Sequence, residues 1–197
     1  MNIEEYTKSV ETNIQVGGDA DHLEHFVLGI MDEVGETVGA AKRVRIGKPL
    51  DRVHFIEELG DFAWYFQGYL RLRGKEWNPP YVDPAKMTIW RRARLAFIAA
   101  GKMADAFDTL YEQTEGFHAD QYDDVDRKRA EWDMDEYAFE VLFHMACLAK
   151  QIDATWEEIF AANHRKLVET RYKNGFSIEA MSNRDKDAER KALEGKE

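Results

Sequence analysis

The 197-residue chain has one cysteine, four prolines and no uninterrupted apolar run long enough to cross a membrane. A disulfide within one chain is excluded, and Cys147, which lies in an apolar run, is expected to be a small buried side chain. Few prolines and few runs of β-branched residues favour a mostly helical protein. Because no signal peptide is visible either, we expect a cytoplasmic protein.

The chain also lacks an excess of basic residues. Its 27 lysines and arginines are outnumbered by 38 aspartates and glutamates, which gives a formal net charge of −11. Proteins that bind nucleic acid or anionic membranes through charge need a basic surface. We therefore expect no nucleic-acid partner and no membrane partner, although a small basic pocket for a phosphorylated molecule is compatible with this charge.

Apolar residues recur every three or four positions through most of the chain, which is typical of amphipathic helices. Breaker residues between these stretches predict six helices, a proline-rich loop at 75–84 and an acidic connection at 118–126. The expected helices span roughly 1–16, 21–45, 51–74, 85–115, 131–151 and 155–174. We predict one all-α bundle domain over residues 1–182, followed by a charged, disordered tail at 183–197.

Two short acidic motifs lie inside the second and third of these helices, Glu33-x-x-Glu36 and Glu58-x-x-Asp61. Residues three apart on a helix share a face, so each motif presents two carboxylates side by side. A breaker cluster at 46–50 is expected to join the two helices into an antiparallel hairpin. Facing residues in such a hairpin have position numbers with a constant sum, and the pairs 36/58 and 33/61 both sum to 94. We therefore expect all four carboxylates at one level of the bundle.

Four carboxylates this close cannot all ionise in a low-dielectric setting without a compensating charge. A hard divalent cation supplies that charge, and Mg²⁺ is the default for carboxylates that act with phosphates, with Mn²⁺ able to substitute. One Glu-x-x-Glu motif is common on solvated helix faces, so this prediction depends on two motifs in matching register. Glu57 points about 100° away from Glu58 around the helix and is expected to support the site or face solvent.

Polar residues also lie along the last predicted helix. Asn163 and Lys166 are one turn apart at the border of its apolar face, and Arg171 and Tyr172 follow at its end. An amide, an ammonium and a guanidinium beside a metal cluster suit a polyphosphate, because lysine gives a point charge and arginine a bidentate fork. Without the acidic motifs, the same cations would only complement the dipole at a helix end.

These segments resemble the MazG-like branch of the all-α nucleoside triphosphate pyrophosphohydrolases. The resemblance is carried by Leu28-Gly29-Ile30 before the first acidic motif, by Glu57-Glu58-Leu59-Gly60-Asp61 with Trp64-Tyr65 after it, and by the closing stretch from Trp156 to Tyr172. It covers about residues 20–73 and 139–176. Residues 75–130 form an insertion that small members of the family lack.

The resemblance implies an all-helical bundle that assembles as a homodimer or homotetramer. It also implies Mg²⁺-dependent cleavage of a (deoxy)nucleoside triphosphate to the monophosphate and pyrophosphate. The metal ligands would be Glu33, Glu36, Glu58 and Asp61, and the general base would be Glu36 or Glu58. The residues in contact with the substrate would be Asn163, Lys166, Arg171 and Tyr172.

Other uses of acidic helices fit the sequence less well. A di-iron bundle needs two Glu-x-x-His motifs, and the chain has one, from Glu115 to His118. An HD-type phosphohydrolase needs a histidine followed directly by an aspartate, which the chain does not contain. The alternative that stays open is a regulatory or interaction bundle that binds a nucleotide without hydrolysing it. The insertion, with Trp77, Tyr81 and Trp90, would then serve partner binding or dimerisation.

Overall fold

The computed structural model describes residues 1–13, 19–83, 87–116, 119–172 and 184–195. Every regular element in these ranges is a helix, so the predicted all-α bundle is confirmed. The elements are α1 (Ile3–Asn13), α2 (Asp19–Arg45), α3 (Arg52–Leu72), α4 (Ile89–Thr114), the 3₁₀ turn η2 (Ala119–Gln121), α5 (Asp124–Gln151), α6 (Trp156–His164), the π-helical η3 (Arg165–Arg171) and α8 (Lys186–Glu194). None of the described helices combines the length and apolar character that a membrane crossing requires.

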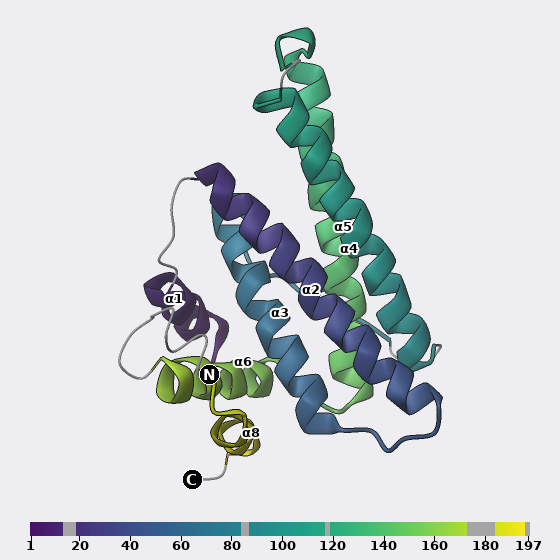
Figure 1. The fold of residues 1–197 in the computed structure, drawn as a ribbon, viewed down its shortest axis with the longest axis vertical. Coiled ribbons are helices and arrows are strands. Elements are labelled where there is room, and N and C mark those ends of the chain that lie inside the picture. The colour runs from purple at the N-terminus through teal and green to yellow at the C-terminus, as the bar shows by residue number, and fades with distance from the viewer. Residues whose placement is uncertain (14–18, 84–86, 117–118, 173–183, 196–197) are drawn as a thin grey trace.

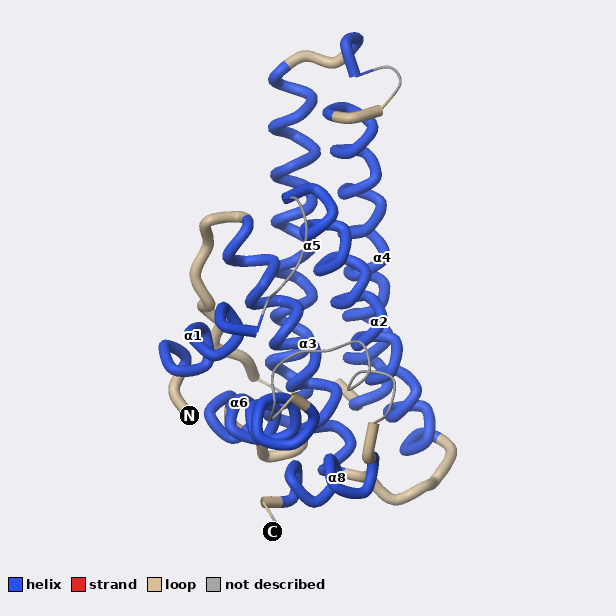
Figure 2. The backbone as a smooth tube through the Cα atoms, turned by 60° about the vertical axis from the view of Figure 1, so that its left-hand side comes forward, coloured by secondary structure: helices blue, strands red, loops and turns tan. Residues whose placement is uncertain are grey.

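Two pairs of long helices make up most of the molecule (Figure 1). Helix α2 packs against α3 and also against α4, and α4 packs along α5. The α4–α5 pair extends beyond the α2–α3 pair at the top of Figure 1, whereas α1, α6 and α8 lie beside α3 at the lower left. Figure 2 shows the same three short helices grouped next to the lower part of α3. The short helices therefore cover the end of α3 that carries the second acidic motif.

The turn between α2 and α3 has the geometry of the predicted hairpin. Gly47 has a φ of +88°, a left-handed conformation that glycine adopts without strain. Gly47 and Lys48 each donate an N–H to a carbonyl in the last turn of α2, both at 3.0 Å, which is a Schellman motif. The Asp51 side chain then accepts from the His54 N–H at 3.1 Å and caps α3. The predicted hairpin with its pivot at Gly47 is confirmed.

Two glycines determine how closely α2 and α3 approach. A Cβ on Gly29 would overlap the ring of Tyr65, and a Cβ on Gly68 would overlap the ring of Phe26. Both contacts join residues whose position numbers sum to 94, as predicted for facing positions. The register that brings the two acidic motifs to one level is therefore present.

The core between α2 and α3 is apolar and almost fully closed. Its side chains are each at most 2% exposed: Phe26, Ile30, Val34, Phe55, Leu59, Phe62 and Phe66. Burying one such side chain contributes about 1.5–3 kcal/mol relative to leaving it exposed. On the other side of α3, Phe160 of α6 stacks on Tyr6 of α1 with ring centroids 4.4 Å apart. This second apolar cluster holds α1 and α6 next to the acidic residues of α3.

Helix boundaries in the second half differ from those predicted. Helix α4 begins at Ile89 rather than near 85, because the Thr88 side chain accepts from the Arg91 N–H at 3.3 Å and caps it. Helix α5 begins at Asp124 rather than 131, because Asp123 forms a capping box. Part of the predicted acidic connection is thus the first turn of α5, where the helix dipole favours negative charge.

The predicted disordered tail is wrong for residues 186–194, which form helix α8. Asp185 caps this helix by accepting from the Ala188 N–H at 3.0 Å, and Leu193 is only 6% exposed. The segment has few apolar residues, so composition predicted disorder. Ion pairs with residues distant in the sequence, described below, hold it against the other helices.

The loop at the start of the predicted insertion covers part of the core. Trp77 lies 4.9 Å from Trp156 and 5.3 Å from Phe160 between ring centroids. Tyr81 is 95% exposed, and Trp90 is partly buried under the Arg45 guanidinium at 5.5 Å. The contacts of Trp77 with Trp156 and Phe160 pack this loop against α6.

Candidate functional site

A cavity of about 560 Å³ is lined by residues of α1, α2, α3, α6, η3 and the segment that leads into α8. Its described lining contains six carboxylates, which are Asp32, Glu33, Glu36, Glu57, Glu58 and Asp61. It also contains two guanidinium groups, Arg171 and Arg184. The fold thus brings the four predicted metal ligands to one cavity, together with Asn163, Arg171 and Tyr172 of the predicted substrate residues.

Three of the predicted ligands converge. Glu33, Glu36 and Glu58 each offer a carboxylate oxygen, and these oxygens lie within 4.8 Å of one another. Burial, followed by the charges of Asp61 and Glu58, raises the pKa of Glu33 to about 9. Carboxylates this close repel one another, and an all-oxygen donor set fits a hard divalent cation.

Asp61 reaches the same cavity but is hydrogen-bonded to protein groups. Its Oδ1 accepts from Nδ2 of Asn163 at 2.7 Å, and its Oδ2 accepts from Nζ of Lys166. Asn163 in turn accepts from the Tyr6 hydroxyl at 2.8 Å and is 1% exposed. Since both its oxygens have protein donors, the role of Asp61 as a fourth metal ligand stays a prediction.

Lys166 is fully buried between two acids. Its Nζ donates to Glu57 at 3.0 Å as well as to Asp61. Burial lowers its pKa, but Asp61 and Glu57 more than compensate, so its pKa lies above the ordinary value and the side chain is charged. Among the described residues that line the cavity, Lys166 is absent. It acts on the cavity through Asp61 and Glu57, and its direct contact with a substrate stays a prediction.

Arg171 is held at the cavity by a buried carboxylate of α8. Its Nε and Nη2 donate to the two oxygens of Glu189, both at 2.7 Å. The guanidinium also lies 5.8 Å from the ring centroid of Tyr172. Both Arg171 and Tyr172 line the cavity, as their predicted role requires, and the contacts that they would make with a substrate stay predictions.

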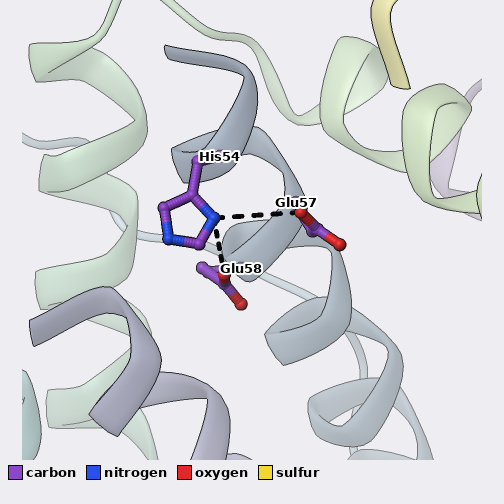
Figure 3. A group of neighbouring side chains, drawn as sticks. All are labelled: His54, Glu57 and Glu58. Carbon is purple, nitrogen blue, oxygen red and sulfur yellow. Dashed lines mark ion pairs between the residues drawn. The ribbon is translucent and has the colours of Figure 1, made fainter. Parts of the chain in front are cut away.

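Two residues that position acids of the site, directly or through a hydrogen-bonded neighbour, were not predicted from the sequence. His54, one turn before Glu58, lies with Nδ1 at 2.9 Å from Glu58 and 3.8 Å from Glu57, and Figure 3 shows its ring directed at both. The carboxylates of Glu57 and Glu58 raise the pKa of His54 to about 9 against the effect of burial, so the ring is a cation at neutral pH. Tyr6 is the second, through the hydrogen bond to Asn163 described above. The four-residue spacing from His54 to Glu58 was a usable signal, whereas nothing local connects Tyr6 to the site.

Glu57 belongs to the site more closely than expected. Burial alone would raise its pKa, but His54 and Lys166 lower it to about 2, so Glu57 is ionised. Its Oε1 lies 3.8 Å from Nη2 of Arg184. Glu57 therefore links the acidic motif of α3 to Lys166 of η3 and to Arg184 in the segment before α8.

The side chains of His25, Trp64 and Tyr65 give part of the cavity lining an aromatic surface. The ring of Tyr65 lies 5.0 Å from that of Trp64 and 5.4 Å from that of His25 between centroids. Burial, followed by Glu33 and Asp61, raises the pKa of Tyr65 to about 12. The cavity thus joins an acidic cluster to flat apolar surfaces and two guanidinium groups.

No family model, no curated protein and no solved structure matches the chain. The MazG-like resemblance consequently depends on the motifs, and it stays a prediction.

Proposed function

We propose that the protein is a MazG-like, Mg²⁺-dependent nucleoside triphosphate pyrophosphohydrolase, which cleaves a (deoxy)nucleoside triphosphate to the monophosphate and pyrophosphate. The observation that carries the proposal is the convergence of Glu33, Glu36 and Glu58 in a cavity that Arg171 and Arg184 also line. A polyphosphate needs cations around it, which a metal on the acids and the guanidinium groups would supply together. The cavity of about 560 Å³ falls within the range of roughly 300–1,000 Å³ of small-molecule sites.

In this reaction the residues of the site would bind metal, accept a proton and balance the charge of the leaving group. Glu33, Glu36 and Glu58, with Asp61 beside them, would hold Mg²⁺, which supplies charge stabilisation to phosphate oxygens and favours ionisation of water. Glu36 or Glu58 would accept the proton of the attacking water. The water oxygen would bond to the α-phosphorus while the bond from that phosphorus to the bridging oxygen breaks. Pyrophosphate would leave with that oxygen, and Arg171 would balance its charge.

The aromatic lining supports a nucleotide as the substrate over an inorganic polyphosphate. His25, Trp64 and Tyr65 present ring faces and edges beside the acids. Stacking of one nucleobase on an aromatic side chain contributes about 1–3 kcal/mol and tolerates any base. The proposal therefore names the class of substrate and leaves the base and sugar to experiment.

A bundle that binds a nucleotide without hydrolysing it is the second candidate. The engagement of both Asp61 oxygens by Asn163 and Lys166 favours it, because fewer oxygens are then available to metal ions. Under either proposal we expect a homodimer or homotetramer in the cytoplasm.

Pyrophosphate release from a panel of nucleoside triphosphates in the presence of Mg²⁺ tests the proposal. We expect release from at least one nucleotide by the wild type and by Glu24→Gln, which changes an exposed acid of α2 outside the cavity lining. Glu36→Gln and Asp61→Asn should reduce turnover by about 100-fold or more, with unchanged helix content by circular dichroism. Nucleotide binding without any pyrophosphate release would favour the second candidate. Wild-type turnover by Glu36→Gln would rule out the proposed ligand set.

A further inference from the structure

Helix α8 contains a buried acid that the hydrolysis scheme does not use. Glu189 is 2% exposed although it belongs to a short, strongly charged helix at the end of the chain. Acids are almost never this buried unless they are paired, because an unpaired charge in the interior costs several kcal/mol. The partners of Glu189 therefore indicate what the helix is for.

Glu189 holds two guanidinium groups at once. Arg171 forms the bidentate pair described above, and Arg184 donates from Nη2 and Nε to Oε2 of Glu189 at 2.8 and 3.2 Å. Both arginines line the cavity, whereas Glu189 is absent from the described lining residues. Glu189, which lies outside the described cavity lining, thus holds both Arg171 and Arg184 in that lining.

Further contacts fasten α8 to the helices that form the site. Arg190 donates from Nη2 and Nη1 to the two oxygens of Asp51, at 2.9 and 3.1 Å, and Asp51 is the N-cap of α3. Arg165 of η3 donates from Nε to the Ala192 carbonyl at 2.9 Å. The position of Glu189 is therefore tied both to the helix that carries the second acidic motif and to η3.

The charge of the cavity explains why a second cation matters. Six carboxylates of the described residues line it, and Nη2 of Arg184 lies 3.8 Å from the carboxylate of Glu57. A polyphosphate that enters such a cavity meets repulsion at every acid that a metal does not neutralise. Two guanidinium groups on the same wall offset that repulsion most for the ligand with the most phosphate charge.

We propose that α8 completes the polyphosphate end of the site. Glu189 is a positioning residue that holds Arg171 and Arg184 as a pair for the terminal phosphates, so that the site prefers triphosphates to monophosphates. The identification of these phosphates as those of a nucleotide rests on the proposed function. The anion site itself can be tested without any hydrolysis.

Calorimetric titration of the full-length protein with inorganic tripolyphosphate in the presence of Mg²⁺ tests this proposal. Glu189→Gln keeps the shape of the side chain and removes its charge, and we expect it to weaken tripolyphosphate binding by about tenfold or more. Affinity for a nucleoside monophosphate and for Mn²⁺ should change by less than about twofold. The matched control Asp187→Asn removes the same charge from an exposed position of α8 and should bind as the wild type does.

A second variant separates positioning of the arginines from the attachment of α8. Arg184→Gln leaves the pair between Arg171 and Glu189 intact and removes one cation from the cavity, so we expect a loss of about three- to tenfold. Where nucleotides are hydrolysed, Glu189→Gln and Arg184→Gln should raise KM more than they lower kcat.

Four outcomes bear on the proposed role of Glu189, and the first also bears on the hydrolase proposal. Tripolyphosphate binding that depends on Glu189, in a protein that releases no pyrophosphate from nucleotides, supports this inference and contradicts the hydrolase. Unchanged tripolyphosphate affinity in Glu189→Gln and Arg184→Gln overturns it, as does the absence of tripolyphosphate binding by the wild type. Equal losses for tripolyphosphate and monophosphate would also overturn it, because they would indicate a structural role alone.

Discussion

His54 is the side chain on which the acidic cluster has its clearest effect. The carboxylates of Glu57 and Glu58 raise its pKa from 6.5 to about 9, although burial opposes the shift. A pKa that is higher in the folded protein than in the unfolded chain means that folding tightens proton binding. The stability from this ion pair is therefore fully present below about pH 6.5, and it is lost as the pH rises through about 9.

We predict that His54→Gln destabilises the metal-free protein only where the wild-type imidazole is protonated. The wild type should exceed the variant by about 1–2 kcal/mol in free energy of unfolding at pH 6, an amount discounted for the partial exposure of the pair. The difference should disappear by about pH 9.5, above the folded-state pKa. Urea unfolding at both pH values measures it. A difference that stays constant with pH would show that packing, rather than charge, accounts for the effect.

The sequence predicted the acids of the site but not their partners. Glu33 and Glu36 share a helix face by local geometry, so spacing alone was sufficient to pair them. The contacts of Asp61 with Asn163 and Lys166 join positions more than one hundred residues apart, which no local period encodes. Residue type predicts that these partners contact the substrate, whereas the structure shows them hydrogen-bonded to protein groups.

The α2–α3 hairpin depends on close contact at two glycines. Since a methyl group on Gly29 would overlap the Tyr65 ring, a larger residue there must push the helices apart. The same helix contains Gly39, around which a methyl group would meet nothing within 4 Å. A comparison of Gly29 with Gly39 therefore distinguishes the need for close packing at Gly29 from the low helix propensity that both glycines share.

We predict opposite effects for alanine at these two positions. Gly29→Ala should destabilise the protein by about 1–3 kcal/mol through overpacking, and should weaken metal binding because the acidic motifs move apart. Gly39→Ala should stabilise it by up to about 1 kcal/mol, the gain of alanine over glycine inside a helix. Urea unfolding gives both values. Equal effects of the two substitutions would contradict the close packing inferred here.

Among the elements, those that carry their own local signals were predicted and those that depend on distant partners were not. Gly47 and Asp51 encode the turn between α2 and α3, so the hairpin followed from the sequence. Thr88 and Asp123 cap α4 and α5, so these helices begin at other residues than the apolar pattern predicts. Composition alone does not predict helix α8, because its buried acid, Glu189, pairs with Arg171 of η3 as well as with the nearby Arg184.

At the scale of the whole molecule, the site is built by packing segments from both ends of the chain onto one hairpin. The α2–α3 pair supplies the acids, and α1, α6, η3 and the segment before α8 supply the groups that orient them or oppose their charge. The chain as a whole carries a formal charge of −11, and six carboxylates in the part that the structure describes line one cavity. A divalent cation at this position would thus reduce repulsion within the fold as well as prepare it for phosphate.

The most direct test of the account is a titration of Mn²⁺ into the metal-free, full-length protein, with unbound Mn²⁺ measured by electron paramagnetic resonance. We expect saturable binding by the wild type and by the Glu24→Gln control, with Mg²⁺ as a competitor. Affinity should fall about tenfold or more in Glu33→Gln, Glu36→Gln and Glu58→Gln. Absence of saturable binding, or equal binding by the wild type and all three variants, would contradict the claim that acids of α2 and α3 share a divalent cation.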